Sequence, residues 1–269
     1  MHAAVLGSPV SHSLSPCIHN AGYVEAGLTH DYRAIDVTVD SFQQFVESLN
    51  SEWMGLSLTM PLKEIAFEVA HDVTQVALLA RSINTLIMGD TIVADNTDVV
   101  GIVNAVRECT DVALQHMLLI GSGATARSAL VAASQLGVTK VDILARNVVA
   151  IEECTNIATQ LNMSLHEVSA EQATTSVHSL TINTTPAGVA DSIAGLIANP
   201  RGVLLDVVYH PWPTALAQRW ESEKLRTVPG YLMLLHQAVR QFEMMTQTDA
   251  PLDAMRNALM AELSKRGQL

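Results

Sequence analysis

The stretch Met117–Leu136, MLLIGSGATARSALVAASQL, decides the fold of this chain. Its first four residues are an apolar run with no polar break, which is typical of a strand buried on both faces of a sheet. Its last ten residues are rich in alanine and favour a helix. Between them, Gly121, Gly123 and Ala126 match the G-x-G-x-x-A form of the dinucleotide-binding turn. The stretch therefore predicts a strand, a turn and a helix that hold a dinucleotide.

The small residues of this turn have separate physical roles. Gly121 permits the tight turn, Gly123 lets a pyrophosphate approach the backbone, and Ala126 keeps the helix close to its strand. Free N–H groups at the start of the helix then face the phosphates. An ordinary turn without a ligand is the alternative, because glycine-rich turns occur in many folds. We expect the whole turn to contact the cofactor: Gly121, Ser122, Gly123, Ala124, Thr125 and Ala126.

Composition limits the possible partners and compartments. The chain has 269 residues, 49% of them apolar, which suffices for two domains or one large one. A net charge of −12 and the lack of a basic run argue against nucleic acid or an anionic membrane as partner. Cys17, Cys109 and Cys154 are odd in number and far apart, which fits a reducing cytoplasm rather than a disulfide framework.

Targeting and metal-binding signals are missing from the sequence. The apolar run His2–Leu6 is too short for a signal peptide, and no window of about 18 apolar residues predicts a membrane span. The ten histidines form no H-E-x-x-H or similar ligand spacing, so we expect no metal. His12 and His19 are interpreted as structural.

Two stretches of the first hundred residues carry candidate site residues. Ser15 precedes Pro16 and looks like a helix N-cap, whereas Ser13 lies in a loop after the strand Ala3–Leu6, where ligands bind in open α/β sheets. The strand Trp53–Leu58 leads to a proline that is expected to open a helical turn containing Lys63. A lysine there is usually solvated, but it opposes the helix dipole, which suits an acid or base better than a structural role.

A strand pair, Arg81–Ile87 and Thr91–Ala94, is predicted next, followed by Asp95-Asn-Thr-Asp98 and a helix over Val99–Val106. Asp98 has two interpretations. It is either the N-cap of that helix or a carboxylate in a cleft between domains, because the next strand is the dinucleotide-binding one.

At this point several motifs resemble those of shikimate dehydrogenases. The opening Gly7–Asn20 is similar to G-x-P-x-x-H-S-x-S-P-x-x-H-N, and Leu58–Lys63 is similar to V-T-x-P-x-K. Ser82–Thr85 resembles the x-x-N-T segment, and Asp95–Asp98 matches D-N-T-D. The motifs follow the family's order and, with those below, span nearly the whole chain.

The resemblance implies roles for these residues. Ser13 and Ser15 would bind the substrate carboxylate, and Lys63 would be the acid/base. The ring hydroxyls would be held by Thr59, Asn84 and Asp98. The family usually has asparagine where this chain has Ser57. A serine would reach the substrate through a water.

The end of the strand Thr139–Ala145 bears on cofactor choice. An NAD enzyme would place Asp or Glu there, whereas this chain has Arg146-Asn147, and an arginine offers a planar fork to a 2′-phosphate. A solvated arginine is the alternative. The family has N-R-T with another basic residue three positions on, where this chain has Ala150. The resemblance therefore implies that the protein binds NADP, with fewer contacts to the 2′-phosphate than the family usually makes.

Three later segments extend the resemblance. Thr184–Gly188 is similar to the N-A-T-x-x-G loop beside the cofactor, which implicates Thr185. The predicted strand Val203–Tyr209 resembles D-x-x-Y, and Pro229–Gln237 resembles G-x-x-M-L-x-x-Q. Tyr209 could instead be an interface aromatic, and Met233 could be core. The resemblance places Tyr209 and Gln237 at the substrate and Val207, Gly230 and Met233 at the cofactor.

We therefore predict two α/β domains with a cleft between them. Residues 1–98, completed by the C-terminal helices 231–269, would bind substrate, and residues 99–230 would form a Rossmann-type doubly wound domain for NADP. The last helix, about Pro251–Leu263, carries Met255, Leu259 and Leu263 as a packing stripe, expected to lie against the first domain.

The implied activity is reversible NADP-dependent reduction of 3-dehydroshikimate to shikimate in aromatic amino acid biosynthesis. The expected partners are therefore small molecules, and the protein would be a monomer or a homodimer. Two alternatives stay open. One is a quinate/shikimate dehydrogenase using NAD, against which Arg146 argues. The other is a sensor that binds shikimate or NADP without turnover, against which the pair Lys63 and Asp98 argues.

Overall fold

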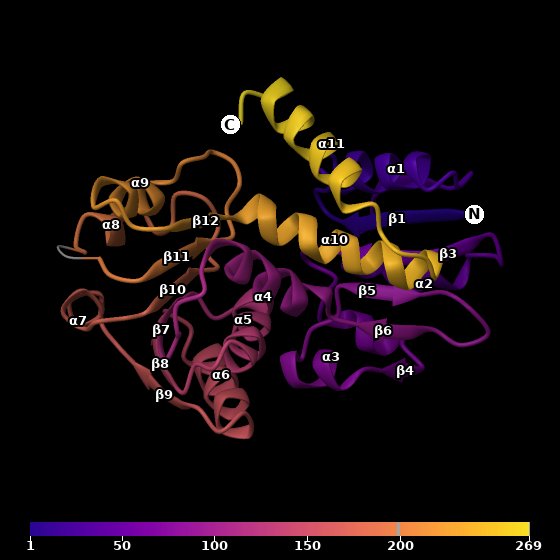
Figure 1. The fold of residues 1–269 in the computed structure, drawn as a ribbon. Coiled ribbons are helices and arrows are strands. Elements are labelled where there is room, and N and C mark those ends of the chain that lie inside the picture. The colour runs from indigo at the N-terminus through magenta and orange to yellow at the C-terminus, as the bar shows by residue number, and fades with distance from the viewer. Residues whose placement is uncertain (198–199, 269) are drawn as a thin grey trace. The chain divides into compact units, whose positions relative to one another are not determined.

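A computed structural model describes residues 1–197 and 200–268. The chain forms two compact units, each built on one six-stranded sheet (Figure 1). The first unit comprises Met1–Gly101 and Leu234–Gly267, and the second comprises Ile102–Met233 together with Gln268. Helices α4 (Thr97–Cys109) and α10 (Gly230–Thr246) contain residues of both units.

The sheet of the first unit is mixed, in the order β2-β1-β3-β5-β6-β4. Its parallel part pairs β1 with β2 and β3, and its antiparallel part joins β3, β5 and β6. The predicted strand Trp53–Leu58 is confirmed residue for residue as β3. The strands are β1 (His2–Gly7), β2 (Asp31–Asp36), β3 (Trp53–Leu58), β4 (Asp72–Val73), β5 (Thr85–Ile87) and β6 (Val93–Asp95).

Helices cover this sheet through tight contacts that small residues allow. A Cβ on Gly55 of β3 would lie 2.6 Å from Cγ of Met245 in α10, so glycine lets this helix approach the sheet. Helix α11 packs against α1 through a fully buried stripe, which confirms the predicted packing of the last helix. That stripe is Met255, Leu259 and Leu263. The helices are α1 (Ser15–Glu25), α2 (Val39–Glu47), α3 (Gln75–Ala80), α10 and α11 (Leu252–Lys265), with a 3₁₀ turn at Ile65–Glu68.

The sheet of the second unit is parallel throughout and doubly wound. Read from β9, its order is β9-β8-β7-β10-β11-β12, which is the 3-2-1-4-5-6 order of dinucleotide-binding folds. The order reverses between β7 and β10, so ligands are expected beyond the carboxyl ends of these two strands. The strands are β7 (His116–Ile120), β8 (Lys140–Leu144), β9 (Ser164–Glu167), β10 (Leu180–Asn183), β11 (Val203–Asp206) and β12 (Thr227–Pro229).

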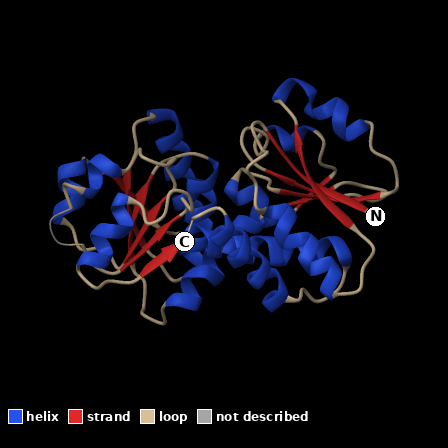
Figure 2. Cartoon of the chain, turned by 90° about the horizontal axis from the view of Figure 1, so that it is seen from above, coloured by secondary structure: helices blue, strands red, loops and turns tan. Residues whose placement is uncertain are grey.

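Helices lie along the strands of this sheet (Figure 2). Helix α5 follows the Gly121 turn and is almost wholly buried from Ala126 to Ala133, as expected of an alanine-rich helix inside an α/β unit. The predicted strand-turn-helix and the predicted fold class are therefore confirmed. The helices are α5 (Ala124–Gln135), α6 (Val148–Gln160), α7 (Ala170–Thr175), α8 (Asp191–Ala194) and α9 (Ala215–Ser222).

Three local predictions were wrong. Ser15 is the first residue of α1 and not its N-cap, and its N–H donates to Oγ of Ser13 at 3.2 Å. Lys63 lies in a turn and not in a helix, because only the 3₁₀ turn from Ile65 onward is helical. Strand β11 ends at Asp206, so Tyr209 lies in the following loop. Within the described part of the chain, no helix combines the length and apolarity needed to cross a membrane.

Candidate functional site

A buried ion pair is the centre of the polar residues in the first unit. Nζ of Lys63 lies 2.5 Å from Oδ2 of Asp98, and the two side chains are 15% and 7% exposed. Asp98 lies in the first turn of α4, where the helix dipole favours a carboxylate. Asp98 was one candidate for the N-cap, but its own N–H donates to Oδ1 of Asn96, which takes the capping role. The carboxylate of Asp98 is thus available to Lys63.

Asn84 holds the other oxygen of that carboxylate. Its Nδ2 donates to Oδ1 of Asp98 at 2.9 Å and lies 3.5 Å from Oε1 of Gln237. Its Oδ1 accepts from the N–H of Thr97 at 2.7 Å and from Oγ1 of Thr85 at 2.8 Å. Because both ends of the amide are committed, Asn84 can point only its nitrogen at Asp98. The structure therefore brings Lys63, Asn84, Asp98 and Gln237 together.

A chain of hydrogen bonds continues from Asn84 into the core of the first unit. Nε2 of Gln241 donates to Oγ1 of Thr85 at 2.9 Å, and Oε1 of Gln241 accepts from Oγ of Ser57 at 2.8 Å. Oγ of Ser57 in turn accepts from the hydroxyl of Tyr32. Ser57 is 4% exposed, so its hydroxyl hydrogen serves the protein and not a bound ligand. Sequence reasoning missed Gln241, although its spacing of four from Gln237 places both on one face of α10.

The two motifs before Lys63 meet at the carboxyl ends of β1 and β3. A Cβ on Gly7 would lie 2.4 Å from Cγ2 of Thr59 and 2.9 Å from the carbonyl oxygen of Met60. Glycine at the end of β1 therefore lets the Thr59 turn approach the loop that carries Ser13. Ser13 is half-buried and Ser15 is 4% exposed, and within the described part of the chain neither serine forms a hydrogen bond with Lys63.

The second unit has a pocket at its strand-order reversal. A cavity of about 560 Å³ opens beyond β7 and β8. Gly121 adopts φ +105° and a Cβ there would lie 2.5 Å from Oγ1 of Thr184, so only glycine fits. A Cβ on Gly123 would meet nothing within 4 Å, which leaves that backbone open to a pyrophosphate. The predicted cofactor residues that line this cavity are Gly121, Ser122, Arg146, Asn147 and Thr185.

Polar residues of the pocket differ in how they are held. Arg146 is exposed and forms no ion pair or hydrogen bond with any residue that the structure describes. Asn147 is the N-cap of α6 and accepts from the N–H of Ala150 at 3.2 Å, so its carbonyl group is engaged. Thr185 donates to Asn183, which in turn donates to Asp206. Burial raises the pKa of Asp206, against the hydrogen bonds that it accepts. The free guanidinium is thus the side chain best able to meet an added phosphate.

Comparison with known proteins gives the same family. The family described as "Shikimate dehydrogenase substrate binding domain" matches residues 5–86, and "Shikimate 5'-dehydrogenase C-terminal domain" matches residues 230–260. A "Shikimate dehydrogenase (NADP(+))" of Leptospira interrogans is 31% identical over 90% of this chain and 88% of its own length. The chain belongs to the shikimate dehydrogenase family.

Solved shikimate dehydrogenases share the whole fold. The enzyme of Mycobacterium tuberculosis is 37% identical with a TM-score of 0.89, and the match covers 97% of this chain and 99% of the other. The enzyme of Thermus thermophilus, solved in complex with NADP(H) and shikimate, is 26% identical with a TM-score of 0.86 and coverage of 97% and 99%.

Other residues that the dehydrogenase resemblance implicates lie outside the pocket lining. Ala126 is fully buried in α5, as its packing role requires. Ala124 and Thr125 also belong to α5 and do not line the cavity. Gly230 approaches Val207, because a Cβ on Gly230 would lie 2.2 Å from the Val207 carbonyl oxygen. The remaining two are Met233, which is 8% exposed, and Tyr209, which is half-buried.

Proposed function

We propose that the protein is an NADP-dependent shikimate dehydrogenase that reduces 3-dehydroshikimate reversibly to shikimate. The observation that carries this proposal is the buried pair of Lys63 and Asp98, whose orientation Asn84 fixes. Relatives named shikimate dehydrogenase (NADP(+)) support the substrate and the cofactor. An oxidoreductase needs a proton donor at the carbonyl oxygen, and a buried ammonium group can serve as one.

We assign the proton transfer to Lys63. When bound, the reduced cofactor supplies the hydride that adds to the carbonyl carbon. Negative charge then builds on the carbonyl oxygen, and the ammonium group of Lys63 donates a proton to it. In the reverse direction the neutral amine accepts the hydroxyl proton. Asp98 holds the amine in place.

Substrate binding is assigned to polar groups of the first unit. Ser13 and Ser15 would bind the carboxylate, and Thr59 and Asn84 would bind ring hydroxyls with Asp98. Gln237 lies within reach of Asn84, which supports its assignment to the same ligand. Tyr209 is assigned to the substrate on the family resemblance alone. Ser57 is assigned an indirect role, because it holds Gln241.

Cofactor binding is assigned to the second unit. The open space at Gly123 fits a pyrophosphate, and the unpaired guanidinium of Arg146 fits a 2′-phosphate. Residues 99–230 would form the NADP-binding domain, and residues 1–98 with 231–269 the substrate-binding domain. Three cysteines without a disulfide support an assignment to the reducing cytoplasm.

The decisive experiment is a spectrophotometric assay of NADP reduction with shikimate, run beside NAD and quinate. We expect turnover with shikimate and NADP to exceed the other three combinations. Faster turnover with quinate and NAD would favour the quinate enzyme. Binding of shikimate by calorimetry without any turnover would favour the sensor and contradict the assignment of Lys63.

A further inference from the structure

Three ligand-type side chains converge in the second unit, away from the cofactor pocket. His116 begins β7, Asp142 lies in β8, and His178 comes two residues before β10. One ligand atom from each lies within 4.8 Å of the others. The cofactor pocket opens beyond the carboxyl ends of these strands, whereas His116 and His178 lie at their amino ends. The cluster therefore has no part in the proposed reaction.

The distances suit a metal ion. Oδ2 of Asp142 lies 2.9 Å from Nε2 of His178 and 3.0 Å from Nε2 of His116. A tetrahedral zinc ion with bonds of about 2.0–2.1 Å holds its ligand atoms about 3.3 Å apart. Each of these two separations thus needs to grow by only a few tenths of an ångström, roughly, to admit the ion, and the ligand nitrogens of the two histidines lie within 4.8 Å of each other.

The hydrogen bonding of His116 leaves its Nε2 able to bind a cation. Its Nδ1 lies 3.0 Å from the carbonyl oxygen of Val177, which only accepts, so Nδ1 carries the hydrogen. In the neutral ring Nε2 is then an acceptor, and it faces a carboxylate oxygen of Asp142 that is also an acceptor. Nε2 is buried and has no hydrogen-bond partner among the described residues. A metal ion between the two atoms would satisfy both, and metal-binding histidines commonly donate their other N–H to a backbone carbonyl.

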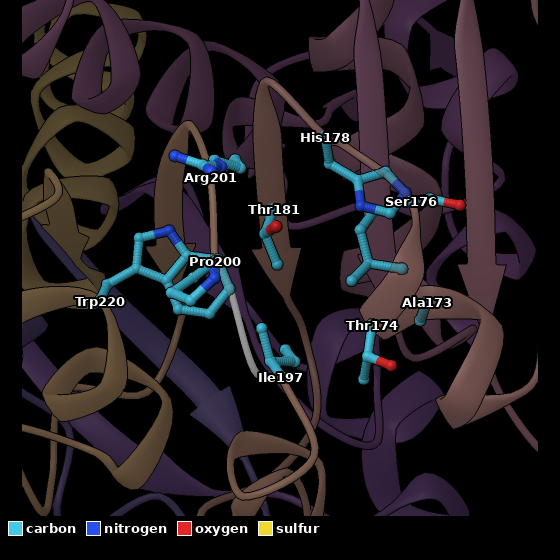
Figure 3. Close-up of a pocket in the computed structure, with 10 residues that line it drawn as sticks. Ala173, Thr174, Ser176, His178, Thr181, Ile197, Pro200, Arg201 and Trp220 are labelled. Atoms are coloured by element: carbon cyan, nitrogen blue, oxygen red, sulfur yellow. The ribbon is translucent and has the colours of Figure 1, made fainter. Parts of the chain in front are cut away.

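The three side chains differ in their access to solvent. His178 and Asp142 are each 5% exposed, whereas His116 is 19% exposed and offers a route from solvent. His178 also lines a small pocket with Thr181 and Trp220, which neither His116 nor Asp142 lines and which holds about 10 Å³ (Figure 3). That is about the space one water molecule requires.

We propose that His116, Asp142 and His178 form a zinc site, with water in the fourth position. Two imidazoles and one carboxylate are ligands that zinc accepts, and three protein ligands leave one position open. The ion would replace the proton that His178 now shares with Asp142. It would join β7, β8 and the segment before β10, and so stabilise the second unit. The sequence predicted no metal because these residues are far apart in the chain and only the fold brings them together.

The test uses the untagged full-length protein, freed of metal by chelator. Calorimetric titration with zinc chloride should give one equivalent bound per chain, and zinc should raise the melting temperature. Asp142→Asn and His178→Gln should each abolish saturable binding and the thermal shift. His210→Gln is the matched control, because His210 is exposed in the same unit, and it should bind zinc normally. Equal binding by all variants, or none by the wild type, would overturn the proposal.

A measurement on the wild type covers the case in which the variants do not fold. Cobalt(II) should give a visible absorption band at one equivalent, and zinc should displace it. Shikimate oxidation should be equal with and without chelator, since the cluster is separate from the proposed reaction. Absence of the cobalt band would contradict the site while leaving the proposed function intact.

Discussion

The two candidate sites differ in how far the protein has already arranged them. In the first unit, Lys63, Asn84 and Asp98 are buried or nearly so and hydrogen-bonded to one another. In the second unit, Arg146 is exposed at a cavity of about 560 Å³ and has no partner among the described residues. On the proposed assignments, chemistry would depend on a fixed network, whereas cofactor choice would depend on one solvated side chain. Substitutions should affect turnover and stability in the first unit and cofactor affinity alone in the second.

The largest effect is expected at Lys63. Lys63→Ala removes the proposed proton donor and should lower kcat by about 10²–10⁴-fold, the usual range for a lost acid or base. Both KM values should change far less, because other groups supply most of the ground-state binding. Steady-state kinetics beside Asp98→Asn would measure this. Near-normal kcat with lost affinity would make Lys63 a binding residue and leave the proton to Asp98 or water.

The next effect concerns stability and pH. Burial lowers the pKa of His19 to about 3, and the ring is fully buried and stacked on Tyr32 at 4.1 Å. The unfolded chain binds a proton near pH 6.5 and the folded chain does not, so stability falls as pH drops below about 6.5. By pH 4 the loss from this group should be roughly 3 kcal/mol.

Urea denaturation across this pH range would check the His19 prediction. His19→Phe keeps a ring of similar size that cannot titrate, so its stability should depend less steeply on pH. Parallel curves for the variant and the wild type would show that His19 is protonated in the folded protein.

A smaller effect is expected at the second site. Arg146→Ala should raise the KM for NADP by about ten- to a hundred-fold and leave that for NAD nearly unchanged, since a charged hydrogen bond is worth roughly 1.5–3 kcal/mol. The melting temperature should stay constant, because the described structure shows no contact that Arg146 would lose. An equal rise in the KM for NADP and for NAD would contradict the assignment of Arg146 to the 2′-phosphate.

The smallest effect is expected at Ser57. Ser57→Ala leaves the hydroxyl of Tyr32 and Oε1 of Gln241 buried without their partner, which should cost about 1–3 kcal/mol of stability. The KM for shikimate should rise only slightly if Ser57 acts through Gln241. Thermal unfolding and steady-state kinetics on one preparation would separate the loss of stability from the change in KM. Ser57→Thr, which keeps the hydroxyl, is the control. A large rise in KM with unchanged stability would indicate that Ser57 binds substrate directly.

The sequence predicted the second unit well because its signals are local. The small residues of the turn at Gly121–Ala126 specify its geometry. Strand β7 before the turn and helix α5 after it lie where the sequence pattern predicts them. Short elements such as α7 and α8 were missed, because six and four residues are too few to show a period.

The network of the first unit could be predicted only in part. Motifs indicated Lys63, Asn84 and Asp98, and the structure joins them. The prediction that Lys63 lies in a helical turn was wrong, because a proline can open a non-helical turn as well as a helix. Gln241 and Tyr32 gave no motif, since their role depends on which strands and helices pack together. For the same reason the sequence did not indicate the cluster of His116, Asp142 and His178.

The neutral amide of Asn84 keeps a second negative charge away from Asp98 in the first site. Its nitrogen faces Oδ1 of Asp98 at 2.9 Å. Its oxygen accepts hydrogen bonds that prevent the amide from flipping. Hydrolysis of that amide to a carboxylate changes the shape of the side chain hardly at all. It would nevertheless set two acidic groups against each other in a buried space, and one of them would have to take up a proton. That proton would compete with Lys63 for Asp98. Asn84→Asp would thus be expected to lower turnover far more than its small change of shape suggests.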